Sequence, residues 1–154
     1  MLEADKTRNF VRQSGIFSTA AQVRGDMVLR CCKTESPELY MAMVLAAQYS
    51  LEKHICVQLA ECGGTVLTGR NNDLQLTLPE YNTWREVLKN DSFREVIAVL
   101  DKPVSKVPDT LLVLDCNGGC YLQRQWSFER SVEKALLERA AAVLPLPKLD
   151  AGEL

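Results

Sequence analysis

The sequence contains little of what catalysis, nucleic-acid binding or membrane insertion usually requires. Its 154 residues include one histidine, His54, and the formal net charge is only −2. This balance excludes a strongly basic nucleic-acid cradle, and a hydrophobic content of 47% excludes an intrinsically disordered chain. The longest apolar run, around residues 41–47, is far shorter than the ~20 residues of a membrane helix. What remains is a soluble mixed α/β domain, large enough to bury a core of its own.

The common catalytic motifs are also missing. A nucleophilic triad needs a histidine as base, and His54 stands at the start of a predicted strand without a Gly-x-Ser-x-Gly elbow. The glycine-containing stretch 62–72, which we expect to be a loop, lacks the Lys and Ser/Thr that a Walker A loop places after its second glycine. Glu129 and Glu133 lie on a charge-mixed helix rather than among apolar neighbours that would raise a pKa. We therefore expect no catalytic residue and no cofactor site in this chain.

The six cysteines are expected to be free thiols. Residues 1–6 are acidic and polar, unlike a secretion signal, so we expect a cytoplasmic chain in a reducing compartment. Cys116 and Cys120 flank a predicted turn and could face each other, which leaves a thiol or zinc site there as an alternative. The spacing of Cys116 and Cys120 differs from the paired Cys-x-x-Cys of zinc ribbons. The other candidate zinc ligands, whose spacing differs from it as well, are His54, Cys56 and Cys62.

The hydrophobic pattern predicts an α+β fold, mainly helical, with about five helices and a small β-sheet. Ser36 and Pro37 form a helix-start signal, and Asn117-Gly118 between two apolar runs predicts a tight hairpin near 111–122. The expected helices span residues 3–14, 18–33, 37–51, 80–90 and 127–144. The expected strands span residues 54–59, 96–100, 111–116 and 120–123. A single accessory domain over 1–144 is expected, with residues 145–154 as a linker.

Two predicted helices carry apolar stripes that we expect to be buried. The stripe of the second helix consists of Ala20, Val23, Met27 and Cys31. Ser127 is the expected N-cap of the last helix, whose stripe consists of Phe128, Val132, Leu136, Ala140 and Val143. Both stripes follow helical spacing, so both predict packing against other elements.

The nearest approach to a nucleic-acid motif lies in the last helix. Arg124, Arg130 and Lys134 are basic residues close to Trp126, and basic residues interleaved with aromatics are typical of single-strand binding. The same helix carries as many acidic side chains, which is typical of an ordinary solvated face. We expect Trp126 to be buried, and the three cations remain candidate contacts for DNA or for a protein partner.

Three segments resemble the N-terminal domain of RecD, the alpha subunit of exodeoxyribonuclease V. The first is the hairpin with its following helix, Leu112-Val113-Leu114-Asp115 and then Tyr121-Leu122-Gln123-Arg124-x-Trp126-x-x-Glu129-x-x-Val132. The second, which is similar to the family's Gly-His-Val-Cys-Leu-Pro-Leu, is His54-Ile55-Cys56-Val57-x-Leu59. The third is the segment 81–88 with Trp84, within the predicted helix 80–90, which falls where the family has a helix carrying a Trp. The resemblance covers roughly residues 39–144. Departures from the family pattern are Lys53, Gln58 and the 117–119 turn.

The resemblance implies a parent protein that is a 5′ to 3′ DNA helicase acting in double-strand break repair and recombination. Its ATP, Mg²⁺ and most of its DNA contacts would belong to motor domains that this chain does not contain. The chain itself would be the non-catalytic domain that docks directly on a RecC-like subunit, with a RecB-like subunit in the same complex. The alternative is a small DNA-binding module that guides single strand to the motor through Arg124, Arg130 and Lys134.

Overall fold

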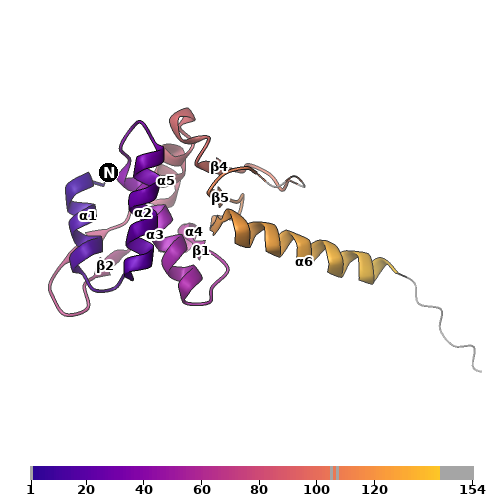
Figure 1. Ribbon diagram of the computed structural model, residues 1–154, viewed down its shortest axis with the longest axis horizontal. Helices are drawn as coiled ribbons and strands as arrows, with labels where there is room; N and C mark the ends of the chain where they lie inside the picture. The colour runs from indigo at the N-terminus through magenta and orange to yellow at the C-terminus, as the bar shows by residue number, and fades with distance from the viewer. Residues whose placement is uncertain (1, 105, 107, 143–154) are drawn as a thin grey trace, which may run out of the picture.

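The computed structural model describes residues 2–104, 106 and 108–142, and their fold is α+β, as predicted. Figure 1 shows a rounded body of helices and short strands from which the last helix projects to one side. Val143 and the expected linker at 145–154 lie outside the described residues. The helices are α1 Ala4–Gln13, α2 Thr19–Cys31, α3 Pro37–Leu51, α4 Leu59–Cys62, α5 Tyr81–Leu88 and α6 Gln123–Ala141.

The described strands form a four-stranded sheet, in the order β1-β6-β5-β4, and a separate two-stranded sheet, β2-β3. β5 and β6 are antiparallel and make the predicted hairpin, while β4 runs parallel to β5. Gly118 takes a φ of +89° in the turn, a conformation that glycine adopts without strain. The strands are β1 Val57–Gln58, β2 Val66–Thr68, β3 Gln75–Thr77, β4 Ile97–Val99, β5 Leu112–Leu114 and β6 Gly119–Leu122.

The predictions for 54–59 and 62–72 were partly wrong. Only Val57 and Gln58 of the predicted strand pair with β6. Leu59 begins α4, and its N–H donates to the carbonyl of Gly118 in the hairpin turn, at 2.9 Å. The stretch 62–72, predicted as a loop, contains β2. β2 is only three residues long and its two apolar residues, Val66 and Leu67, are adjacent, so the sequence shows no alternating pattern there.

Helix α3 lies at the centre of the body, and α2 packs closely along it. Ser36 caps α3 as predicted, since its Oγ accepts a hydrogen bond from the Leu39 N–H at 3.2 Å. Nine consecutive apolar residues of α3, from Leu39 to Ala47, are buried, so the helix is surrounded by other elements. Trp84 of α5 is fully buried, and its Nε1 donates to the Glu38 carbonyl at 3.0 Å.

The prediction for the buried face of α2 was wrong. Its buried residues are Ala21, Gly25 and Val28, whereas Val23 is 57% and Met27 46% exposed. The reason is the close approach of α2 to α3 at Gly25. A Cβ on Gly25 would lie 2.5 Å from Val44 Cγ2, so only glycine lets the two helices come this close. This contact turns the predicted apolar stripe outward, with Ala20 and Cys31 also exposed.

Candidate protein-docking surface on helix α6

Helix α6 is fixed to the body through its first turns. It begins at Gln123, directly after β6, so the prediction of a start at Ser127 was wrong. The expected burial of Trp126 is confirmed, because its side chain is 3% exposed and packs with Val113 and Tyr121 of the hairpin. Gln125 Nε2 donates to Ser50 Oγ at the end of α3, at 2.6 Å. The sheet and α3 together therefore determine the direction in which α6 leaves the body.

Beyond these turns α6 lies in solvent. Residues 131–142 are all exposed, and Figure 1 shows no other described element alongside this part of the helix. Phe128 is 69% exposed, Val132 42% and Leu136 60%. Their spacing of four residues places them on one face, which we call the α6 stripe. Its predicted burial was wrong within this chain, because nothing in the described residues covers it.

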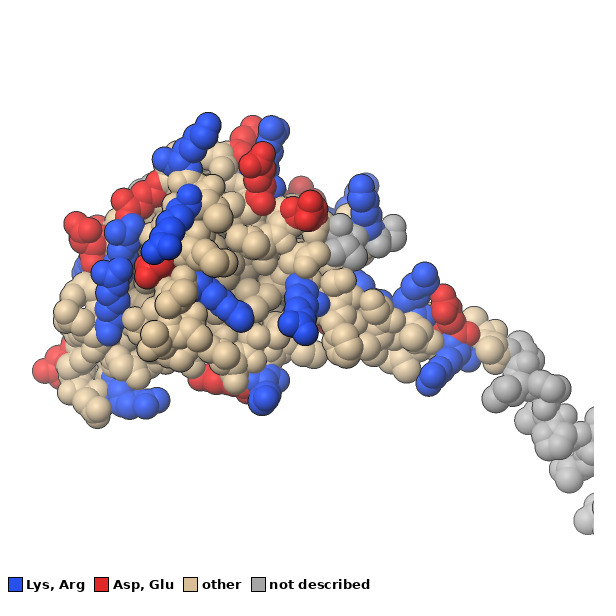
Figure 2. All heavy atoms as spheres, viewed as in Figure 1, with Lys and Arg blue, Asp and Glu red and all other residues tan. Residues whose placement is uncertain are grey.

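The α6 stripe continues onto the body at its base. Gln125 precedes Phe128 by three residues, so both project from the same face of the helix. Because Gln125 bonds Ser50, the end of α3 lies beside the base of the stripe. Two further apolar side chains are exposed there, Leu51 at 44% and Ile55 at 53%. Figure 2 shows mostly uncharged surface where α6 leaves the body and charged side chains toward its far end.

The opposite face of α6 borders a groove of about 540 Å³. Its apolar lining comes from Pro103, Val104 and Leu137, and Leu137 is 63% exposed. The predicted stripe omitted Leu137. The signal in the sequence was the doubled Leu136-Leu137, since adjacent residues of a helix point about 100° apart and so reach two faces. The charged rim of the groove carries both signs and consists of Arg130, Glu133, Lys134 and Glu138.

The three candidate cations do not form one cluster. Arg130 and Lys134 both line the groove, whereas Arg124 is exposed about 120° around the helix from Arg130. Arg130 already binds two carboxylates, Glu133 at 2.7 Å and Glu129 at 3.3 Å, and its guanidinium lies 5.7 Å from the Trp126 ring centroid. Arg130 therefore acts as a local partner of α6 side chains, which lowers its capacity to attract a phosphate.

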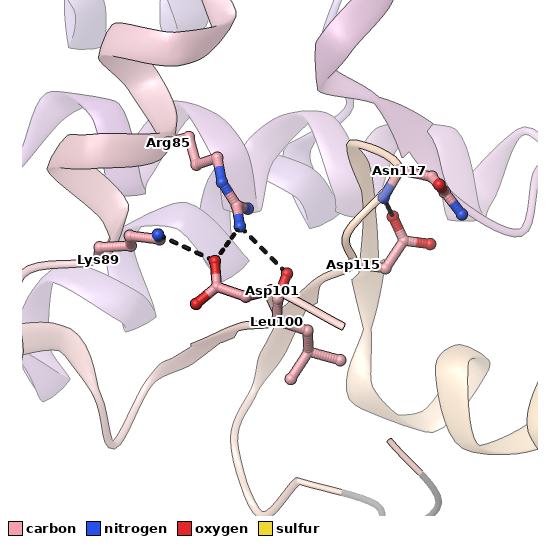
Figure 3. A network of polar contacts seen from close by, with 6 residues as sticks. All are labelled: Arg85, Lys89, Leu100, Asp101, Asp115 and Asn117. Carbon is pink, nitrogen blue, oxygen red and sulfur yellow. Dashed lines mark hydrogen bonds and ion pairs between the residues drawn. The ribbon is translucent and has the colours of Figure 1, made fainter. Parts of the chain in front are cut away.

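A second polar network holds the sheet and α5 together (Figure 3). Arg85 donates to the Leu100 carbonyl at 3.2 Å and to Asp101 at 2.6 Å, and Lys89 contacts the same carboxylate at 3.0 Å. The hydrogen bond and charge of Lys89 lower the pKa of Asp101 from its ordinary value. In the hairpin turn, Asp115 accepts from the backbone N–H of Asn117 at 2.9 Å. Each contact is made within the fold, so these groups are structural.

The structure does not bring Cys116 and Cys120 face to face across the hairpin. Across the hairpin Cys120 stands opposite Leu114, not Cys116. Cys120 is buried, and burial raises the pKa of its thiol; burial also raises the pKa of Cys62 to about 11. Both thiols are therefore protonated and weakly nucleophilic near neutral pH. In residues 2–104, 106 and 108–142, no group of three or more His, Cys, Asp or Glu side chains could hold a metal ion. His54 is exposed, with its ring 5.4 Å from that of Tyr49.

No helix among the described residues has both the length and the apolarity that crossing a membrane requires. Comparison of the chain with protein families, with curated proteins and with solved structures gives no match. The function therefore has to be argued from the surface that α6 presents.

Proposed function

We propose that this chain is a non-catalytic docking domain of a RecD-like helicase subunit of exodeoxyribonuclease V, and that the α6 stripe is its docking surface. Its direct partner would be a RecC-like subunit, with a RecB-like subunit in the same cytoplasmic complex. ATP, Mg²⁺ and most DNA contacts would belong to the parent motor. The single observation that carries the proposal is the exposed apolar stripe on a helix whose buried contacts, among the described residues, lie in its first turns.

The composition of the stripe favours a protein partner. Phe128, Val132 and Leu136 offer large apolar side chains, and an aromatic near the centre of an interface often carries much of the binding energy. A stable interface buries about 600–1,000 Å² on each side, more than one helical stripe supplies. The exposed Leu51 and Ile55 at the base extend the apolar surface toward that size.

The sharpest test uses two adjacent leucines of equal chemistry. Leu136 is 60% exposed and belongs to the stripe, whereas Leu137 is 63% exposed and faces the groove. Leu136→Ser should weaken binding to the purified RecC-like subunit by about tenfold or more, because each buried leucine is worth roughly 1.5–3 kcal/mol. Leu137→Ser is the matched control and should change the affinity by less than about threefold. Isothermal titration calorimetry measures both affinities.

Two results would oppose the proposal. The first is separate elution of the wild-type chain and the RecC-like subunit in size-exclusion chromatography with light scattering. The second is a loss of binding with Leu137→Ser but not with Leu136→Ser, which would move the interface to the groove. Titration with single-stranded DNA tests the alternative. Binding that falls steeply with salt and is lost on neutralising Arg124 and Lys134 would identify a DNA-binding module, since phosphate contacts release counterions.

A further inference from the structure

The outward face of α2 carries a second uncovered apolar stripe. Ala20, Val23, Met27 and Cys31 are all exposed, and we call them the α2 stripe. Gly25, about 160° around the helix from Met27, is pressed against α3, so the α2 stripe points away from the body. Figure 1 shows α2 lying across the front of the body. Figure 2, in the same view, shows uncharged surface there with basic and acidic side chains beside it.

The α2 stripe is bordered by an arginine on each side. Arg24 and Arg30 lie three residues before and after Met27, and each projects about 60° from it, in opposite directions around the helix. Neither arginine makes an ion pair within the part of the chain that the structure describes. The nearest acidic residue of the helix, Asp26, is 3.6 Å from Arg12 of α1. Each side of the α2 stripe therefore carries one arginine without an ion pair among the described residues, and Asp26, in contact with Arg12, lies beyond Arg30 on the same side.

We propose that the α2 stripe is a docking surface for an amphipathic helix of another protein, one whose apolar ridge is bordered by Asp or Glu on both sides. The apolar side chains of the partner would cover Val23 and Met27, and its carboxylates would pair with Arg24 and Arg30. Arginine suits this role because its planar guanidinium binds a carboxylate with two parallel hydrogen bonds. This surface is separate from the α6 stripe and does not depend on the function proposed for it.

The two arginines disfavour the other occupants of such a face. A second copy of this chain would bring Arg24 or Arg30 toward the same arginines of its partner, because each border of the α2 stripe carries one of them. Like charges placed opposite each other at an interface are unfavourable. A nucleic-acid backbone would pair with the arginines but would leave the uncharged ridge between them without a partner.

The test uses two synthetic helical peptides with the same leucine ridge. One peptide carries glutamate at the flanking positions and the other carries lysine. Fluorescence anisotropy at low salt should show the glutamate peptide binding about tenfold or more tightly than the lysine peptide. Met27→Ser should weaken binding of the glutamate peptide by about fivefold or more. The double variant Arg24→Glu, Arg30→Glu should reverse the preference, so that the lysine peptide binds more tightly.

Met27 and Arg30 are exposed and Arg24 is half-buried, and circular dichroism would check that each variant remains folded. Leu136→Ser should leave peptide binding unchanged, which separates this surface from the α6 stripe. Equal binding of the two peptides would overturn the proposal, as would no binding of either. The proposal would also be overturned if the double variant Arg24→Glu, Arg30→Glu still preferred the glutamate peptide. A dimer that light scattering detects and that Met27→Ser dissociates would overturn it as well. Binding of a single-stranded oligonucleotide that Met27→Ser does not affect would also overturn it, in favour of nucleic acid.

Discussion

Gly25→Ala should destabilise the protein, although alanine is the better helix former. A Cβ at this position would lie 2.5 Å from Val44 Cγ2 and 2.7 Å from Tyr40 Cε2. Carbon atoms in contact are normally about 3.5–4.0 Å apart, so α2 or its neighbours would have to move. Tyr40 is 1% and Val44 0% exposed, which leaves neither side chain free space to retreat into.

Two opposing terms set the size of the effect. Replacing glycine by alanine within a helix gains about 1 kcal/mol from backbone entropy. Overpacking a well-packed core costs typically about 1–3 kcal/mol. Because both contacts are shorter than 3.0 Å and both neighbours are buried, we place the cost in the upper part of that range. The expected net result is a loss of about 1–2 kcal/mol in the free energy of unfolding.

Urea denaturation followed by circular dichroism measures this difference as a shift in the midpoint at unchanged slope. Ala20→Gly is the matched control, because Ala20 is exposed in the same helix and should lose only the propensity term, about 1 kcal/mol. A Gly25→Ala protein more stable than the wild type would refute the close packing of α2 on α3. The outward direction of the α2 stripe would then lose its structural basis.

Three further predictions concern the core and the anchoring of α6. Trp126→Ala should cost about 3 kcal/mol or more and speed hydrogen exchange along α6, because Trp126 is the main buried contact of that helix; unchanged exchange would contradict the anchoring. Tyr40→Phe should raise the free energy of unfolding by roughly 1 kcal/mol in a urea titration, since the Tyr40 hydroxyl is buried without a hydrogen-bond partner among the described residues; a loss of similar size would show that it has one. Burial raises the pKa of Cys62 from 9.0 to about 11 and that of Tyr40 from 10.0 to about 12. The folded state favours the protonated form of both side chains. Their contribution to the free energy of unfolding is therefore complete below pH 9.0 and is lost as the pH rises through 11 and 12. Unfolding free energies that stay constant from pH 8 to about 12 would contradict this reasoning.

Predictions that depended on short stretches of sequence were confirmed at Ser36 and in the hairpin, but not for the N-cap at Ser127. The start of the helix after Ser36 needs only the serine side chain, and the hairpin needs only the Asn117-Gly118 turn. In both cases neighbouring backbone groups supply the hydrogen-bond partners. Burial of Trp126 was also confirmed. The expectation of five helices was close, and the element it omitted, α4, is four residues long and produces no periodic signal.

Placing apolar faces required the tertiary structure. The spacing of Val23 and Met27 predicts a stripe, and a stripe exists, but periodicity does not indicate whether another element covers it. Gly25 decided the orientation of α2, and its effect arises from Val44 and Tyr40 of another helix. The same holds for α6, whose stripe is regular in sequence and uncovered in the described chain.

The sequence by itself determined the α+β class, the hairpin and the helix start at Ser36, because these depend on contacts between neighbours along the chain. Only the tertiary structure decided that two apolar stripes, on α2 and α6, remain exposed. The physical reason is that burial is a property of the whole arrangement: an apolar face is buried only where another surface lies against it.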